Sequence, residues 1–304
     1  MNERGILAVV VTYNRKQLLE ECLECLKRQT MPCDILIVDN ASTDGTGEWL
    51  KREQAASVLY YNTGANLGGA GGFSAGMKEG VRRGYSYLWV MDDDTMPEPD
   101  ALEQIWAASD LLSGEYGFLS SFVRWTDGSP CEMNVPGVSR TWREDIDRLP
   151  LGMLRVEYAS FVSLFLPTSV IRDVGLPIRQ FFIWADDMEY SLRISRKYPC
   201  YFVQRSQVIH KMKTNAATDI IQDGSDRLDR YRLLFRNRLY VERKKGKGAA
   251  MLYMVYGIKT VFRILAHSPQ KKGKKCRYVI SGLWRGIWFH PKIEFCDEKE
   301  CGQE

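Results

Sequence analysis

Along its first 94 residues the chain alternates between short, continuous apolar runs and segments in which apolar residues recur every three or four positions. Continuous runs are typical of strands buried on both faces of a sheet, whereas the second spacing indicates helices. Strands are predicted at 6–14, 33–42, 58–63 and 87–94, and helices at 15–29, at 43–54 and within 64–84 after a glycine-rich turn. This alternation implies right-handed crossovers, so we predict an α/β fold with a mostly parallel central sheet.

The pattern becomes less regular in the second half of the chain. It indicates a strand and then a helix within 158–175, a helix that starts with acidic residues within 181–199, and a strand at 200–212. From Leu228 onward helical spacing dominates. We therefore divide the chain into an α/β domain at 1–226 and a helical C-terminal region at 227–304.

The composition is that of a folded protein from a reducing compartment. Of the 304 residues, 45% are apolar, which is enough for one large α/β domain with an appendage. Cys22 and Cys25 form a C-x-x-C inside a helical pattern, so we expect buried reduced thiols rather than a zinc or redox site. The segment Met1–Gly5 is polar and the apolar run after it is a short strand. No signal peptide is therefore predicted, and we expect a cytoplasmic location.

Positive charge is concentrated in the C-terminal region. Residues 227–295 contain 18 Lys/Arg and three acidic residues, a balance of +15, whereas the whole chain carries +4. Apolar stretches occur here at 248–268 and 278–290, but Lys259 and Arg263 near the middle of the first argue against a bilayer span. We predict helices that hold the protein peripherally on the inner face of the cell membrane.

The basic region allows two alternatives to membrane binding. It could be a helical subdomain packed on the α/β domain, which could also form a contact between copies in a homo-oligomer. Nucleic-acid binding is disfavoured, because no recognised nucleic-acid motif accompanies the basic residues and the rest of the chain carries −11. We expect no nucleic-acid partner.

Polar residues close all four predicted strands of the first half. They are Thr12-Tyr13-Asn14, Asp39-Asn40, Asn62 and Asp92-Asp93-Asp94. The carboxyl ends of parallel strands meet at one edge of a sheet, and ligands bind there in folds of this kind. A turn explains any one of these groups, since Asn and Asp are common turn residues. Four groups at one edge indicate a binding site.

The triple aspartate suits a divalent cation. Asp92 and Asp94, two positions apart at an extended strand end, point to the same side, whereas Asp93 is directed elsewhere. Carboxylate oxygens suit Mg²⁺ and Mn²⁺, which favour binding alongside substrate phosphates. The alternative is a turn with solvated carboxylates. Asp39 could accept a hydrogen bond from a nucleobase imide N–H, or it could cap a turn.

The glycine-rich stretch "NLGGAGGFSAG" matches neither common nucleotide-binding motif. It lacks the Gly-Lys-Ser/Thr ending of a phosphate-binding loop, and it follows the third strand, where the dinucleotide fingerprint does not occur. Its glycines nevertheless allow the backbone to pass close to a ligand.

Taken in order, several motifs resemble those of inverting, sugar-nucleotide-dependent glycosyltransferases of family 2, which have the GT-A fold. "VVTYNR" resembles their opening strand, "VDNASTDGT" their base-binding strand and "VMDDDT" their metal-binding D-x-D. "NLGGAGGFSAGM" resembles the galactofuranosyltransferase branch, with rhamnosyltransferases close behind. "FFIWADDMEYSLR" resembles the segment that carries the acceptor base, and "VIHKM" the segment with a metal-binding histidine. The resemblance covers residues 6 to about 215.

The resemblance implies a role for each matching residue. Asp92, Asp94 and His210 would hold Mn²⁺ or Mg²⁺. Asp187 would be the general base, with Asp186 as the alternative, because the acidic pair follows Ala185 rather than the tryptophan. Trp184 would stack on an acceptor sugar or merely pack. The residues that would contact the donor are Thr12, Tyr13, Asn14, Arg15, Asp39, Asn66, Asp92 and Asp93.

The implied activity is a single inverting displacement. The favoured reaction moves galactofuranose from UDP-galactofuranose to a cell-surface glycan or glycolipid acceptor. Two alternatives remain, which are rhamnosyl transfer from dTDP-rhamnose and a non-catalytic sugar-nucleotide-binding protein. The division of the chain would then be a GT-A catalytic domain at 1–226 and a basic helical region at 227–304.

Overall fold

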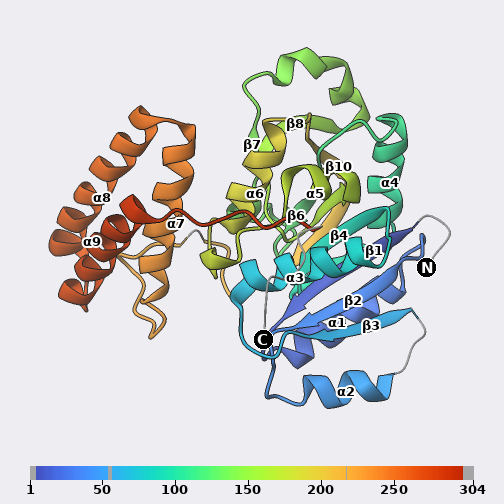
Figure 1. The fold of residues 1–304 in the computed structure, drawn as a ribbon, viewed down its shortest axis with the longest axis horizontal. Coiled ribbons are helices and arrows are strands. Elements are labelled where there is room, and N and C mark those ends of the chain that lie inside the picture. Colours follow the sequence, from blue (N-terminus) through green and yellow to red (C-terminus); the bar gives the residue numbers. More distant parts are fainter. Residues whose placement is uncertain (1–4, 54–56, 217, 297–304) are drawn as a thin grey trace.

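A ten-stranded mixed sheet forms the centre of the computed structural model, which describes residues 5–53, 57–216 and 218–296 (Figure 1). Its strand order is β3-β2-β1-β4-β9-β6-β10-β8-β7, and β5 pairs with β10 outside this path. The strands are β1 (Ile6–Thr12), β2 (Asp34–Asp39), β3 (Val58–Asn62), β4 (Tyr87–Asp92), β5 (Thr95–Pro97), β6 (Leu119–Arg124), β7 (Gly137–Val138), β8 (Met153–Tyr158), β9 (Leu164–Pro167) and β10 (Tyr201–His210).

Helices connect the strands and form the C-terminal region. The α-helices are α1 (Lys16–Lys27), α2 (Thr46–Glu53), α3 (Gly68–Arg82), α4 (Ala101–Leu111), α5 (Thr168–Val174), α6 (Asp186–Ser195), α7 (Arg230–Lys245), α8 (Lys247–His267) and α9 (Lys272–Trp288). Short 3₁₀ segments are η1 (Glu132–Asn134), η2 (Trp142–Leu151) and η3 (Arg179–Phe181). The predicted α/β fold is confirmed.

The two halves of the sheet differ in strand direction. β1 pairs in parallel with both β2 and β4, and β3 extends this parallel half, as the alternating pattern predicts. β9 is antiparallel to β4 and to β6, whereas β6 and β10 are parallel. The irregular pattern of the second half therefore corresponds to short antiparallel pairings inserted next to the parallel strands.

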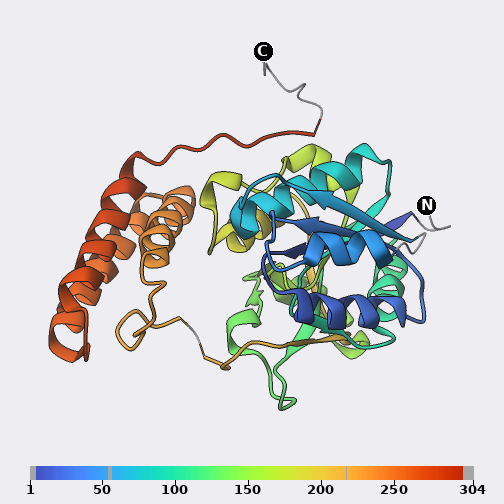
Figure 2. The ribbon, with the colours of Figure 1, turned by 90° about the horizontal axis from the view of Figure 1, so that it is seen from below.

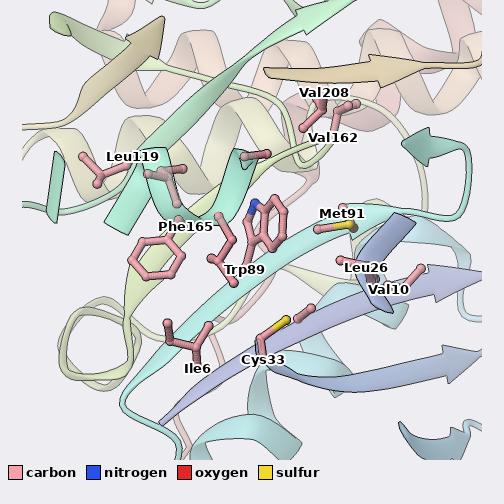
Figure 3. Packing of buried hydrophobic residues seen from close by; sticks show 14 of the residues in the cluster. Ile6, Val10, Leu26, Cys33, Trp89, Met91, Leu119, Val162, Phe165 and Val208 are labelled. Atoms are coloured by element: carbon pink, nitrogen blue, oxygen red, sulfur yellow. The ribbon is translucent and has the colours of Figure 1, made fainter. Parts of the chain in front are cut away.

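Buried side chains from both halves meet around Trp89 (Figure 3). Trp89 is fully buried in β4, and its indole Nε1 donates a hydrogen bond to Ser163 Oγ at 2.8 Å. Phe165 of β9 packs in the same cluster and is also fully buried. Burying a side chain of this size stabilises the fold by about 1.5–3 kcal/mol. Cys22 is buried on α1, and it and the half-buried Cys25 are free thiols, as expected.

The glycine-rich stretch leads into a helix, as predicted, but more of the stretch is helical than the predicted turn implied. α3 begins at Gly68, so most of these glycines lie within its first turns. A Cβ at Gly72 would lie 2.5 Å from Cγ1 of Val11, and one at Gly76 would lie 2.5 Å from Cγ1 of Val9. Such distances are too short for a side chain, so these glycines let α3 lie directly on β1.

The three C-terminal helices lie side by side at one end of the α/β body (Figures 1 and 2). After α9 the chain returns over the body, where the Leu176 N–H donates to the Glu294 carbonyl at 2.8 Å. The α8 helix packs one face on α7 and α9, and much of its apolar surface stays exposed. Among the described residues, α8 is the one helix whose length and composition would suffice to cross a membrane.

Candidate active site

Strand pairing brings His210 next to the acidic end of β4. The chain leaves β4 at Asp92 and re-enters the sheet as β5 at Thr95, and His210 lies opposite Thr95 in the antiparallel β5–β10 pair. His210 Nε2 therefore lies 3.1 Å from Asp94 Oδ1, although 116 residues separate the two in sequence. One ligand atom each from Asp92, Asp94 and His210 lies within 4.8 Å of the others. The predicted cluster forms.

A second interaction orients the histidine. Asn134 in η1 donates from Nδ2 to Ser160 Oγ at 2.9 Å, which identifies its Oδ1 as the free acceptor. His210 Nδ1 lies 2.9 Å from that oxygen and is the donor to it. Nε2 is left facing the carboxylates, as in metal sites where the other ring nitrogen is hydrogen-bonded. Sequence reasoning missed Asn134, because nothing in its local sequence indicates this contact.

Two of the three groups have raised pKa values, whereas the third has a lowered one. Burial, followed by the charge of Asp94, raises the pKa of Asp92 to about 7. Burial alone would lower the pKa of His210, but hydrogen bonding and attraction by the carboxylates outweigh it and raise that pKa to about 10. Burial opposes ionisation of Asp94 too, yet His210 and Arg15 hold its pKa below the usual value. A divalent cation would replace these protons and relieve the repulsion, so the donor set fits one.

Arg15 and Thr12 hold the remaining aspartate. Thr12 Oγ1 donates to Asp93 Oδ2 at 2.8 Å, which holds the Asp93 carboxylate in place beside β1. The Arg15 guanidinium spans both carboxylates, with Nη1 3.2 Å from Asp93 Oδ1 and 2.5 Å from Asp94 Oδ2. The Arg15 side chain is 46% exposed, so it lies at the rim of the cluster, where an anionic group could reach it.

The other predicted donor-contacting residues shape the loops at the strand ends. Asp39 accepts from Tyr60 Oη and from the Ser42 N–H, both at 2.8 Å, so both of its oxygens have partners. Asn14 has a left-handed backbone (φ 53°) and accepts from the Thr43 N–H at 2.7 Å. Asn66 accepts from the Gly68 N–H at 2.9 Å. Tyr13 is 42% exposed beside these loops.

The segment that leads into α6 has a strained backbone. Phe182, Trp184 and Ala185 all have φ near +65°, a conformation that is unfavourable for side chains of this size. Asn237 on α7 is fully buried, and its Nδ2 lies 2.9–3.1 Å from the carbonyls of Phe181, Ile183 and Trp184. Helix α7 thus holds the segment that leads into Asp186 and Asp187. Sequence reasoning did not find Asn237.

The environments of the two helix-start aspartates differ. Burial, followed by the charges of Asp187 and Asp92, raises the pKa of Asp186 well above its usual value. Burial also raises the pKa of Asp187, but the N–H of Met188 and the charge of Arg238 oppose this. The Met188 N–H donates to Asp187 Oδ1 at 2.7 Å. The contribution of the Asp92 charge to the raised pKa of Asp186 indicates that the acidic start of α6 and the strand-end cluster face one region.

Trp184 packs on the C-terminal region. Its ring centroid lies 5.3 Å from that of Tyr231 on α7, at an interplanar angle of 55°. The ring is half-buried and belongs to the cluster formed by α7, α8 and α9. Trp184 therefore packs against the C-terminal helices, which is the second of the two interpretations, and part of its side chain stays accessible.

Comparison with known proteins shows which families and folds this chain resembles. Residues 7–111 match the model of glycosyl transferase family 2. Galactofuranosyltransferase GlfT1 of Mycobacterium tuberculosis is 29% identical over 210 residues, which cover 63% of this chain and 65% of the relative. Undecaprenyl-phosphate mannosyltransferase of Micrococcus luteus is 36% identical over 116 residues, covering 36% of this chain and 47% of the relative. The chain thus spans less than two thirds of the length of either relative.

A solved structure shares the fold. The crystal structure of GalNAc-T7 with UDP, GalNAc and Mn²⁺ superimposes with a TM-score of 0.60 at 12% identity, over 87% of this chain and 58% of that one. The chain therefore shares the fold of this solved structure, and its first third is similar to glycosyl transferase family 2.

Proposed function

We propose that this protein is a metal-dependent, inverting glycosyltransferase that moves galactofuranose from UDP-galactofuranose to a cell-surface or lipid-linked glycan. The observation that carries the proposal is the convergence of Asp92, Asp94 and His210 at one strand edge, in electrostatic range of the acidic start of α6. A metal-binding group facing a carboxylate pair supplies both parts that an inverting displacement needs. These parts are a stabilised leaving group and a base for the acceptor hydroxyl.

Asp92, Asp94 and His210 would hold the cation, Mn²⁺ or Mg²⁺, which when bound stabilises the negative charge that develops on the departing nucleoside diphosphate. Arg15 at the rim of this cluster would bind a donor phosphate, because its guanidinium is accessible and already fixed by two carboxylates. Thr12 positions Asp93 to accept hydrogen bonds from the ribose or the sugar. Tyr13, Asn14, Asp39 and Asn66 would form the walls of the nucleoside site.

Asp187 would remove the proton of the acceptor hydroxyl. A base must be ionised before it acts. Burial raises the pKa of Asp187, and the Met188 N–H together with Arg238 opposes this rise. Asp186, in contrast, lies between the charges of Asp187 and Asp92, which favour its protonated form. Asp186 remains the alternative base. Since attack and departure take place on opposite faces of the anomeric carbon, one displacement inverts its configuration.

The choice of donor rests on similarity. The 29% identity to a galactofuranosyltransferase over 63% of the chain supports galactofuranose, and rhamnose from dTDP-rhamnose is the second candidate. A donor screen tests both the sugar and the activity. The protein is incubated with Mn²⁺, membrane extract as acceptor and a panel of sugar nucleotides, and release of nucleoside diphosphate is measured. Release from UDP-galactofuranose is expected, whereas tight donor binding without release from any donor would identify a non-catalytic binding protein.

The C-terminal helices would hold the enzyme on an anionic membrane surface, on the inner face of the cell membrane. Leu252 and Phe262 of α8 are 72% and 67% exposed, and Trp284 and Trp288 of α9 are 64% and 69% exposed. The region that contains them is basic, since residues 227–295 carry a balance of +15. Apolar side chains that enter the headgroup region and cations that attract anionic lipids together favour a bilayer as the partner of this face.

A further inference from the structure

A cationic cavity lies between α7 and α9, away from the strand-end cluster. Its volume is about 670 Å³. Its lining includes Arg232 of α7 and a stripe on α9 formed by Lys274, Arg277, Tyr278, Ser281 and Arg285. The α9 residues recur every three or four positions, so they lie on one face of the helix. Among the described residues, no acidic side chain contributes to this lining.

Two glycines of α9 place the two sides of the cavity close together. A Cβ at Gly282 would lie 2.7 Å from the Arg232 carbonyl oxygen, and one at Gly286 would lie 3.0 Å from Cβ of Leu239. The α7 and α9 backbones therefore approach closely at these positions, as only glycine permits. This approach holds Arg232 against the basic stripe of α9.

Counter-charges to the cations of this cavity are absent among the residues that the structure describes. Within the described parts of the chain, no ion pair joins Arg232, Lys274, Arg277 or Arg285 to an acid. Nε of Arg232 is buried and has no hydrogen-bond partner there. Burial, followed by the charges of Arg285 and Arg232, lowers the pKa of the neighbouring Arg236 to about 10. Crowded arginines with an unsatisfied buried N–H fit a bound anion, since guanidinium groups pair with phosphate through two hydrogen bonds.

An apolar hollow adjoins the cationic one. It has a volume of about 530 Å³ and shares Arg277 and Ser281 with the first cavity. Its remaining walls include Cys276, Ile280 and Trp284, and the last two are 58% and 64% exposed. A site for a small soluble anion does not need an apolar extension. A phosphate attached to a hydrocarbon chain does, because the chain must also leave water.

One turn of α7 links this cavity to the acceptor side of the active site. Tyr231, which precedes Arg232, packs on Trp184 at 5.3 Å between ring centroids. Arg230 is close enough to Arg15 for the two charges to affect each other. A ligand held at Arg232 is therefore anchored near the segment that carries Asp186 and Asp187.

We propose that this cavity binds the phosphate or diphosphate group of a membrane lipid, with the hydrocarbon chain along Ile280 and Trp284. The proposal rests on the proposed function, for which it names an acceptor class: a sugar carried by a lipid phosphate. The same phosphate chemistry occurs in bulk anionic phospholipids. The experiment therefore compares an isoprenoid lipid phosphate with a phospholipid.

The test uses the full chain and needs no sugar donor, so it is independent of glycosyl transfer. Vesicles of phosphatidylcholine, alone or with a minor fraction of undecaprenyl phosphate or of phosphatidylglycerol, are sedimented with the protein. Inorganic diphosphate binding is measured by calorimetry. The variant Arg277→Gln/Arg285→Gln removes two exposed cavity cations, and Lys259→Gln/Arg263→Gln removes two exposed cations from α8 outside the cavity. Ser281→Glu, which places a carboxylate in the cavity, is a second variant of the site.

The cavity variants should lose binding of diphosphate and of lipid phosphate by about tenfold or more relative to the α8 variant, since each loses charge-assisted hydrogen bonds. Preference for undecaprenyl phosphate over phosphatidylglycerol would support the acceptor as the source of the phosphate. Equal retention on both lipids, lost in the cavity variants, would support a headgroup site and overturn the acceptor assignment. Equal losses of binding in the cavity and α8 variants, or no binding of any phosphate probe, would overturn the assignment of this cavity as a phosphate site.

Discussion

The side-chain amide of Asn237 on α7 donates to the carbonyl of Trp184, with 2.9 Å between Nδ2 and the oxygen. Asn237 is fully buried, and Trp184 lies two residues before Asp186 in a segment with left-handed backbone angles. The C-terminal region therefore does more than cover the α/β body, since one of its side chains fixes the strained backbone that presents the candidate base.

Replacing Asn237 with Ala should weaken both the fold and the reaction. The substitution removes the Asn237 donor from the carbonyls of Ile183 and Trp184, and leaving a buried polar group unsatisfied costs about 1–3 kcal/mol. Denaturant unfolding measures the stability, and turnover is measured at a temperature where the variant is folded. Ser169→Ala, at an exposed position of α5, serves as the control. Normal turnover in a destabilised Asn237→Ala protein would limit Asn237 to a role in stability.

Removal of the divalent cation should abolish transfer. Excess chelator is expected to stop product formation, and added Mn²⁺ should restore it. Asp94→Ala should weaken metal-dependent donor binding, because Asp94 contacts both His210 and Arg15 in the cluster. Donor binding is measured by calorimetry with and without Mn²⁺. Full activity in excess chelator would contradict the assignment of this metal site.

Metal affinity should rise with pH. In the metal-free protein His210, with a pKa of about 10, and Asp92, with a pKa of about 7, carry protons that the cation must displace. The apparent dissociation constant for Mn²⁺ should therefore fall between pH 6 and 8, by up to about tenfold per pH unit for each proton released. Fluorescence titration at several pH values measures it. An affinity independent of pH would show that no ligand proton is displaced.

The stability of the metal-free protein should fall as pH rises. The folded pKa of His210, about 10, lies above its ordinary value of 6.5, so protonation stabilises the fold. This contribution is complete below about pH 6.5 and is lost as pH rises towards 10. Thermal unfolding in chelator should show the decrease in the wild type and a smaller one in His210→Ala. Parallel pH profiles for the two proteins would rule out this linkage.

Asp187→Asn should reduce turnover by about 10²–10⁴, the usual loss for a missing general base. The amide keeps the shape of the side chain, so donor affinity and melting temperature should stay near those of the wild type. Asp186→Asn is the matched variant at the adjacent position. Steady-state rates and donor binding are compared for both. A large loss in Asp186→Asn, with near-normal turnover in Asp187→Asn, would transfer the role of base to Asp186.

Membrane binding should depend on anionic lipid and on the exposed apolar face of α8. Sedimentation with vesicles should decrease with salt, because screening weakens the attraction to headgroups. Phe262→Asp should release the protein, since it places a charge where an apolar side chain enters the interface. Leu111→Asp, at a position of α4 that is 62% exposed on the α/β body, should have no effect. Equal sedimentation with neutral and anionic vesicles would contradict the proposal.

The local sequence determined the parallel half of the fold and the acidic half of the site. Continuous apolar runs are typical of strands buried on both faces, and each run carries its own polar ending, so Asp92 and Asp94 were predictable from adjacent residues. His210 was found through its resemblance to a family motif, and its approach to Asp94 depends on the β5–β10 pairing. The contacts of Asn134 and Asn237, and the meeting of Arg232 with the basic stripe of α9, are also long-range. Only the tertiary structure decided them, because periodicity reports which face of an element is buried and not which element packs against it. The glycines of α3 illustrate the same limit. Glycine is required at these positions because β1 lies close to the helix, and no local sequence pattern indicates that contact.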